Sequence, residues 1–369
     1  MRRSTMATAR RSRVALATIL LAIACADSPT EPGAWVRVDP VGRPTVVRGI
    51  YVNAQVAGSP SQLGGLLDKV DGTSVNTFVI DVKERGEVSY ASRVPLVASV
   101  GAGRGHIQDL PAVLRALRAL RARGIYPIAR IVCFSDPVLA EARPDWAIRT
   151  TSGGVWLDAE SNRPWVDPYN PEVWAYNIDL AREALAMGFA EIQWDYVRFP
   201  DVTDSVRAGM VFPARAGRSA ADGIEQFVAA SRTELAGDGA PITVDVFGRV
   251  VTTIGDDGIG QDWDQLTQIV DVILPMVYPA LYSPGSFGLP NPNAEPYLLV
   301  RASMDSAVAR ASRSGAVRAT IRPWLQAFTQ GSPPYGTQQM LDQIRAVEDA
   351  GLEEWLFWNP DGVYPAGWP

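Results

Sequence analysis

The feature of the sequence that most constrains the fold is a regular alternation of eight strand-like runs with helical segments. Each run is apolar and rich in β-branched or aromatic residues, as expected for strands covered on both faces. We expect strands at residues 48–56, 77–83, 125–134, 191–199, 242–247, 270–278, 317–325 and 354–358. Alternating strands and helices indicate a parallel sheet, and eight such strands close most economically into a single-domain (β/α)₈ TIM barrel.

The helices between the strands carry recognisable start and stop signals. Asn170 and Pro171 are typical of an N-cap and a first helical position, and Gly188 stands where a C-cap glycine belongs. Further helices are expected at residues 110–123, 220–235, 296–314 and 337–350. A doubly wound sheet is the alternative fold. It is disfavoured because the first strand runs into residues 53–58, which lack the glycine spacing of a dinucleotide-binding turn.

The first residues have the pattern of a secretory signal. Five arginines precede an apolar run from Val14 to Ala24, and Cys25 follows. We therefore expect residues 1–24 to be a signal peptide and the protein to be exported. The residues before Cys25 resemble a lipoprotein cleavage box, which would make Cys25 a lipidated first residue; alternatively Cys25 is an ordinary signal residue. Residues 25–47, rich in Pro, Asp and Gly, are expected to form a flexible linker to the barrel at 48–369.

Composition excludes several classes of function. Without residues 1–24 the net charge falls from −6 to −11, because five arginines and no acidic residue are removed. Such a chain is a poor candidate for binding nucleic acid, and the only membrane contact we expect is a lipid on Cys25. Cys133, the remaining cysteine, is expected to be a buried thiol. The single histidine, His106, argues against a histidine-based metal site or catalytic triad, so we expect no metal and no cofactor.

Carboxylates are concentrated near the ends of the expected strands. Asp81 and Glu84 end the second strand, Asp195 the fourth and Asp245 the fifth. A charged Asp inside an apolar strand costs several kcal/mol unless it is paired, so such residues mark ion pairs or functional sites. In a barrel, chemistry is located at the carboxyl ends of the strands, where these side chains lie.

Asp195 and Asp245 form the pair that we expect to be catalytic. Neighbouring parallel strands lie about 4.8 Å apart, so both carboxylates can approach one sugar ring at the roughly 5 Å spacing of retaining glycosidases. Arg198 would supply the counter-charge for Asp195 as nucleophile, and an apolar setting near Phe247 would favour Asp245 as general acid/base. The alternatives are a structural salt bridge between Asp195 and Arg198, and a structural role for Asp245.

Other acidic residues are held in reserve. Asp81 could bind substrate hydroxyls or replace Asp245 as the acid, and Glu84 is a second reserve. Lys83 is expected to neutralise one of them. The acidic cluster at residues 256–264 hints at calcium, but Asp262 fits better as the N-cap of the next helix.

Aromatic residues suggest carbohydrate binding. Trp146, Trp156 and Trp165 fall in a long segment, residues 135–169, whose length suggests a functional loop. Aromatic rings stack on sugar faces while carboxylates accept from the hydroxyls; the alternative is that these tryptophans fasten the loop to the barrel. The further residues expected to contact a sugar at the strand ends are Tyr51, Tyr196, Arg198, Tyr278, Trp324, Gln326 and Trp358.

Short motifs at the strand ends carry a resemblance. They are Arg48-Gly-Ile-Tyr51, Asp81-Val-Lys83, Asp195-Tyr-Val-Arg-Phe-Pro200, Asp245-Val-Phe-Gly248, Pro275-Met-Val-Tyr-Pro279 and Arg322-Pro-Trp-Leu-Gln326. Through them residues 48–368 resemble a glycosyl hydrolase-like barrel family found in many bacteria as a domain of unknown function. The resemblance implies a TIM-type barrel similar to the α-galactosidase and α-amylase groups, with Asp195 in the place of their fourth-strand nucleophile. Their acid/base lies on the fifth or sixth strand; here the sixth ends in Tyr278, which favours Asp245.

Three functions remain open at this point. The leading one is a retaining O-glycoside hydrolase that acts on an extracellular or cell-envelope oligo- or polysaccharide, with Asp195 as nucleophile and Asp245 as general acid/base. The second is a barrel anchored at the cell envelope that binds glycan without cleaving it. The third is another hydrolase or lyase, such as a polysaccharide deacetylase, which would normally need a metal and is disfavoured by the single His106.

Overall fold

The computed structural model describes Met1 and residues 37–103, 109–313 and 317–365. The predicted signal peptide, Cys25 and His106 lie outside these residues. The barrel lies within the compact unit that begins at Arg37.

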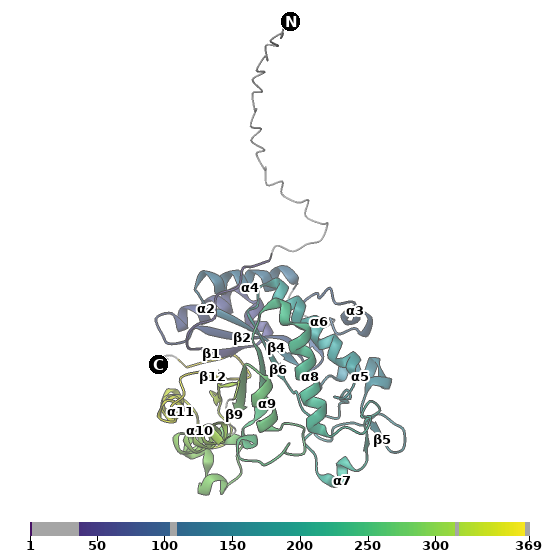
Figure 1. Cartoon of the computed structure of the whole chain (residues 1–369). Helices are drawn as coiled ribbons and strands as arrows, with labels where there is room; N and C mark the ends of the chain where they lie inside the picture. Colours follow the sequence, from purple (N-terminus) through teal and green to yellow (C-terminus); the bar gives the residue numbers. More distant parts are fainter. Residues whose placement is uncertain (2–36, 104–108, 314–316, 366–369) are drawn as a thin grey trace. The chain divides into compact units, whose positions relative to one another are not determined.

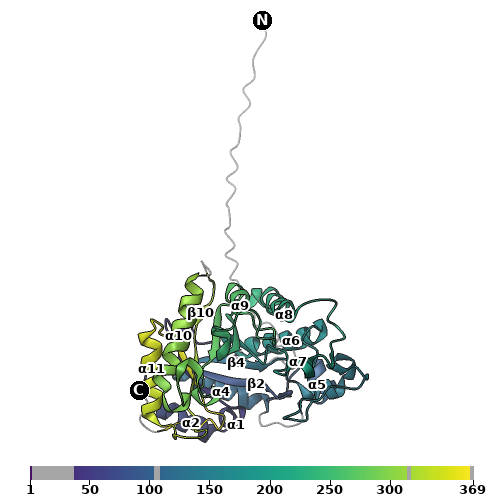
Figure 2. The same cartoon turned by 90° about the horizontal axis from the view of Figure 1, so that it is seen from below.

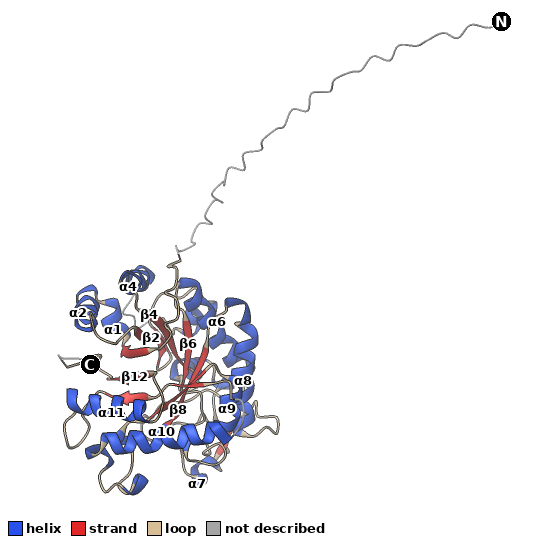
Figure 3. Cartoon of the chain, turned by 60° about the vertical axis from the view of Figure 1, so that its left-hand side comes forward, coloured by secondary structure: helices blue, strands red, loops and turns tan. Residues whose placement is uncertain are grey.

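Parallel strands close into a barrel, which confirms the predicted fold (Figures 1 and 3). Each strand pairs with the next, and the last pairs with the first. The seventh position is shared by two short strands, β10 and β11, of which β10 pairs with β9 and β11 with both β9 and β12. In chain order the barrel strands are β1 (Arg48–Val52), β2 (Thr77–Glu84), β4 (Tyr126–Val132), β6 (Glu191–Asp195), β8 (Ile242–Phe247), β9 (Val272–Met276), β10 (Thr320–Ile321), β11 (Trp324–Gln326) and β12 (Trp355–Trp358).

Helices surround the strands, as Figures 2 and 3 show. The five predicted helices are confirmed to within a residue or two, and α2 and α9 lie outside the predicted ranges. Asp262 caps α9 by accepting from the backbone N–H groups of Asp264 and Gln265, as the sequence indicated. The long helices are α2 (Pro60–Val70), α4 (Leu110–Ala122), α6 (Pro171–Met187), α8 (Ala220–Glu234), α9 (Trp263–Ile269), α10 (Pro296–Arg313) and α11 (Thr337–Asp349).

Shorter elements decorate the connections. The segment after β4 is not an irregular loop, since it contains a helix and a strand, and that strand pairs with another one that follows β6. Trp156 and Trp165 are buried in this segment, so both help to fasten it to the barrel. The short elements are α1 (Ala54–Gly58), β3 (Glu87–Val88), α3 (Pro95–Val100), α5 (Pro137–Ala142), β5 (Arg149–Thr150), α7 (Asp204–Arg207) and β7 (Met210–Val211).

The described end of the expected linker contacts the domain. The backbone N–H of Val38 donates to the carbonyl oxygen of Met187 at 3.0 Å, and Arg43 forms an ion pair with Glu354 at 2.9 Å. Val47 is fully buried beneath the barrel strands. The part of the predicted linker from 37 to 47 is therefore attached to the barrel by specific contacts. No helix among the residues described above is long and apolar enough to cross a membrane.

The amino-terminal end of the barrel holds a buried charged cluster. The Arg322 guanidinium, which follows β10, donates to Glu191 at 2.6 Å and to Glu354 at 2.8 Å. Glu191 is the first residue of β6, and Glu354 directly precedes β12. Three strands are thus linked by one side chain at the end of the barrel opposite to the expected site.

Candidate active site

A pocket of about 260 Å³ opens at the carboxyl ends of the barrel strands. Eight of the residues that line it were predicted from the sequence to belong to the site: Glu84, Asp195, Tyr196, Arg198, Asp245, Tyr278, Trp324 and Trp358. The carboxyl ends of parallel strands are where barrel enzymes bind substrate, so the pocket is the candidate active site.

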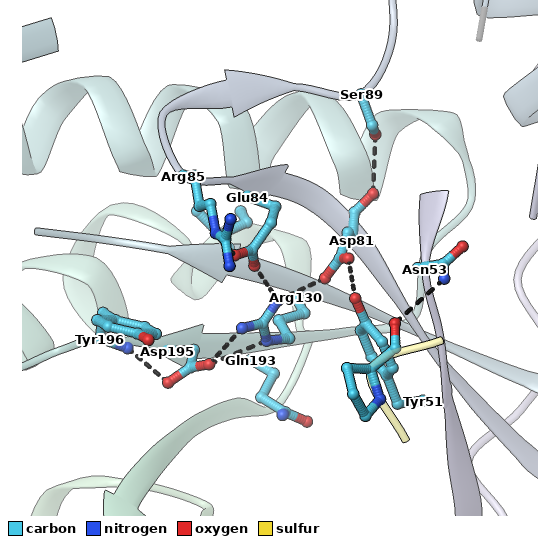
Figure 4. Close-up of polar contacts among 12 residues, drawn as sticks. Tyr51, Asn53, Asp81, Glu84, Arg85, Ser89, Arg130, Gln193, Asp195 and Tyr196 are labelled. Carbon is cyan, nitrogen blue, oxygen red and sulfur yellow. Dashed lines mark hydrogen bonds and ion pairs between the residues drawn. The ribbon is translucent and has the colours of Figure 1, made fainter. Parts of the chain in front are cut away.

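Arg130 on β4 is the centre of the polar network and was not selected from the sequence (Figure 4). Its Nε and Nη2 donate to Oδ2 of Asp195 at 3.0 and 2.6 Å. Its Nη1 donates at 2.6 Å both to Oδ1 of Asp81 and to Oε2 of Glu84. One buried guanidinium therefore serves three carboxylates from two strands. The sequence does contain an indication of its role. An Arg inside an apolar strand is as unfavourable as an Asp there unless it is paired, so Arg130 meets the same criterion as Asp195.

A β-bulge in β2 places two of these carboxylates on the same side. The pairing with β4 matches Asp81 to Arg130 but Lys83 to Ile131, so one residue of β2 has no partner. A bulge shifts the alternation of side chains along a strand. Asp81 and Glu84 therefore both reach Arg130, although simple alternation would turn them to opposite faces.

Lys83 does not neutralise Asp81 or Glu84, contrary to the expectation from the sequence. The bulge turns its side chain toward the helices, where Nζ forms an ion pair with Asp136 at 2.8 Å and donates to Asn177 at 2.7 Å. The side chains of Lys83 and Asp136 are both 0% exposed. Lys83 is therefore a link between β2 and the helical layer.

Asp81 is held behind Arg130 and does not line the pocket. The Tyr51 hydroxyl donates to its Oδ2 in a short hydrogen bond, and Tyr51 itself stacks on Trp358 with ring centroids 3.9 Å apart. Burial raises the pKa of Asp81 to about 6, against the opposing effect of the Arg130 charge. Asp81 thus positions Arg130, and Tyr51 positions Trp358. Neither Asp81 nor Tyr51 lines the pocket itself, contrary to their predicted role in substrate binding.

Asp195 ends β6 and faces the pocket. Its Oδ2 accepts from Arg130, and its Oδ1 accepts from the backbone N–H of Tyr196 at 2.6 Å. Tyr196 has a φ of 48°, a left-handed conformation that is unusual for a bulky residue. Such strain is typical of functional sites, and here the turn aims an N–H group back at the carboxylate.

Asp245 on the neighbouring strand β8 has a different environment. It is only 1% exposed and accepts from Gln193 Nε2 at 2.9 and 3.0 Å and from Trp324 Nε1 at 2.8 Å. No arginine or lysine forms an ion pair with it among the described residues. Burial raises the pKa of Asp245 well above its usual range, and the negative charge of Asp195 raises it further.

Two sequence expectations about the rim are changed by the structure. Arg198 does not pair with Asp195, because Arg130 occupies that carboxylate. Gln326 does not reach the pocket: its Oε1 accepts from the Ala280 backbone N–H at 2.9 Å, and its Nε2 donates to the Phe328 carbonyl at 3.0 Å. It fixes the connection after β9 instead of contacting a ligand.

The acidic cluster at 256–264 is used for internal contacts. Asp257 forms an ion pair with Arg249, and Asp264 forms one with Arg310. Within the described parts of the chain, no group of three or more His, Cys, Asp or Glu side chains is arranged to hold a metal ion.

Solved structures resemble the domain. A hypothetical protein from Ruminiclostridium thermocellum is 34% identical over 54% of this chain and 97% of its own, with a TM-score of 0.48. The PgaB (BpsB) glycoside hydrolase domain from Bordetella bronchiseptica is 13% identical over 86% of this chain and 95% of its own, with a TM-score of 0.59. An α-galactosidase from Thermus thermophilus is 16% identical over 88% of this chain and 60% of its own, with a TM-score of 0.52. At these identities the last two show a shared barrel fold.

The family comparison covers nearly the whole barrel. No curated protein matches the chain. Residues 49–364 match the family described as "Putative glycosyl hydrolase domain". This range runs from within β1 to beyond β12 and includes every side chain of the pocket. The chain therefore belongs to this family.

Proposed function

We propose that the domain is a retaining O-glycoside hydrolase acting on an oligo- or polysaccharide outside the cytoplasm, with Asp195 as nucleophile and Asp245 as general acid/base. One observation carries the proposal. Two carboxylates on neighbouring strands line one pocket in opposite environments, Asp195 against the Arg130 guanidinium and Asp245 buried without a cation. Pairs of acids whose environments separate their pKa values are typical of glycosidase sites.

The first step would form a covalent glycosyl-enzyme. Asp195 attacks the anomeric carbon while neutral Asp245 donates its proton to the departing glycosidic oxygen, so the C–O bond breaks as the new ester bond forms. The raised pKa of Asp245 favours the proton-carrying form that this step requires. Gln193 Oε1 is buried and has no hydrogen-bond partner among the described residues, and a turned amide would let it accept from neutral Asp245.

The second step would release the sugar. Asp245, now a carboxylate, takes a proton from water as the water oxygen attacks the anomeric carbon, and Asp195 leaves with its electron pair. Arg130 keeps its two hydrogen bonds to Asp195 throughout, which stabilises the carboxylate as it is regenerated. The rings of Trp324, Trp358 and Tyr278 provide apolar wall area for the sugar.

A barrel that binds glycan without turnover remains a second candidate, because Asp245 is only 1% exposed. An acid that substrate cannot reach would leave a binding pocket with aromatic walls. Turnover measurements separate the two candidates directly.

The test compares Asp195→Asn with wild type for release of reducing ends from a panel of polysaccharides. We expect wild type to cleave at least one of them and the variant to be slower by on the order of 10⁴-fold or more, because the nucleophile is lost. Asp201→Asn is the matched control, since Asp201 is a nearby acid that pairs with Arg249 and does not line the pocket. Equal rates for wild type and Asp195→Asn on a cleaved polysaccharide would refute the assignment.

A further inference from the structure

A second pocket adjoins the candidate active site. Its volume is about 760 Å³, and it lies over the connections that follow β2, β4 and β6. Four residues line both pockets: Glu84, Arg85, Tyr196 and Arg198. A sugar unit bound over Asp195 would therefore have its neighbour in this second pocket, with Arg198 between the two.

Arg198 is a buried cation without a counter-ion. Arg198 as a residue is 9% exposed, and its only protein acceptor among the described residues is the carbonyl oxygen of Phe199, 3.0 Å from Nη1. A guanidinium has five N–H donors, so most of them are left for something other than protein. The donors that remain border the two pockets.

Aromatic rings hold this guanidinium in place. Its central carbon lies 4.5 Å from the ring centroid of Phe247, 4.9 Å from that of Tyr196 and 5.0 Å from that of Trp165. These rings fix the plane of the group and exclude water from its faces, but they do not neutralise its charge. The N–H edge is consequently the part that is available to a ligand.

The other buried arginines of the barrel, Arg130 and Arg322, both lie against carboxylates. Arg130 has three carboxylate partners, and Arg322 has two. Arg198 has none within 4 Å in the described chain, because the nearby Asp195 is taken by Arg130 and Asp201 by Arg249. Burial lowers the pKa of the Arg198 guanidinium accordingly. An unpaired buried charge is costly, and such a cost is retained where a ligand supplies the missing partner.

We propose that Arg198 binds an oxyanion carried by the substrate, so that the domain acts on acidic glycans bearing a carboxylate, sulfate or phosphate group. The planar fork of a guanidinium matches the geometry of each of these groups, which two parallel N–H bonds can hold. The acidic group belongs to the sugar at the junction of the two pockets. That the bound glycan is a substrate rests on the proposed function. The anion site itself can be tested without turnover.

The first experiment detects the anion directly at the side chain. Sodium glucuronate, sulfate and phosphate are titrated separately into the full domain at constant ionic strength, with chloride as the reference, and the ¹⁵N–¹H signals of the arginine Nε groups are followed. The Arg198 signal is identified as the one missing from Arg198→Met. We expect it to shift saturably with at least one oxyanion, and the most effective one names the acidic group. No saturable shift with any of the three, or a shift no larger than that of Arg143, would overturn the proposal.

The second experiment separates a binding role from a structural one. Arg198→Met, Arg198→Lys and a control, Arg143→Gln, are compared for affinity toward the effective oxyanion and for the urea midpoint of unfolding. Arg143 also lies against a tryptophan, 3.8 Å from the Trp146 centroid, but it has a carboxylate partner in Asp145. We expect binding to weaken about tenfold or more in Arg198→Met and less in Arg198→Lys, without a lower urea midpoint. A lowered midpoint with unchanged affinity would show that Arg198 is structural.

The two proposals fail in different ways. An Arg198 signal that responds to oxyanions in a protein that cleaves no glycan would count against the hydrolase assignment alone. Cleavage of a neutral glycan by a protein whose Arg198 signal ignores all three oxyanions would count against the anion site alone.

Discussion

Two buried arginines lie between carboxylates at opposite ends of the barrel. Arg322, at the amino ends of the strands, donates to Glu191 and Glu354. Arg130, near the carboxyl ends, donates to Asp195, Asp81 and Glu84. Both side chains connect strands that are distant in sequence, and both need their partners because an isolated buried charge is unfavourable.

The charged side chains at the two ends differ in their solvent exposure and in their ion pairing. At the amino end, the side chains of Arg322 and Glu191 are 0% exposed and are enclosed by protein. At the carboxyl end the Glu84 side chain is 37% exposed and Asp195 faces a pocket, and Asp245 beside it forms no ion pair with any residue that the structure describes. The comparison indicates that the closed cluster serves stability and that the open one serves chemistry.

Among the variants that test this comparison, the largest effect should come from Asp245→Asn. We expect glycan cleavage to fall by about 10² to 10⁴-fold, because an amide cannot donate or take up the proton. The loss should be smaller for glycosides with an acidic leaving group, which need less proton donation. The free energy of unfolding should change little or rise, since a buried acid without a cation is removed. Equal losses for good and poor leaving groups would place the acid elsewhere, with Glu84 the next residue to examine.

Arg322→Met tests the closed cluster and should reverse this pattern. It leaves the buried Glu191 carboxylate without its ion-pair partner and Glu354 with Arg43 alone, so we expect the free energy of unfolding to fall by about 3–5 kcal/mol. Cleavage per folded molecule should be unchanged because the cluster is remote from the pocket. Urea unfolding and specific activity, each measured on the same preparation, check the prediction. Loss of activity in fully folded protein would contradict the separation of roles.

A smaller effect is expected in the pH dependence of stability. Asp81 has a pKa of about 6 in the fold, above the roughly 3.9 of an unfolded chain. Between these values the folded chain holds more protons than the unfolded chain, so the contribution of Asp81 is full below about pH 4 and declines as pH rises through 6. Asp81→Asn should remove this decline. Urea denaturation from pH 4 to 7 checks this: as pH rises, the unfolding free energy of wild type should fall relative to that of the variant. A difference between the two that stays constant with pH would exclude the effect.

Most of the fold could be predicted because the pattern of strands and helices is periodic, and strand order alone made Asp195 and Asp245 neighbours. Two parts of the site could not be predicted from the sequence. The bulge in β2 exchanges the faces on which Lys83 and Glu84 lie, and no residue of the motif indicates this irregular register. The choice of Arg130 over Arg198 as partner of Asp195 depends on the left-handed turn at Tyr196, which ends the strand before Arg198. Both depend on local backbone geometry that alternation does not include.

The most direct test of the central claim is peptide mapping of the enzyme during turnover. Asp245→Asn is mixed with an aryl glycoside of the sugar that wild type releases, whose acidic leaving group needs little proton donation, and is then quenched in acid, digested and analysed by mass spectrometry. The first step stays fast on such a substrate, and slow second-step hydrolysis should let the intermediate accumulate. The account predicts a glycosyl group on the peptide that contains Asp195. A glycosyl group on a peptide carrying Asp81 or Glu84 instead, or inversion of the anomeric centre in the wild-type product, would contradict it.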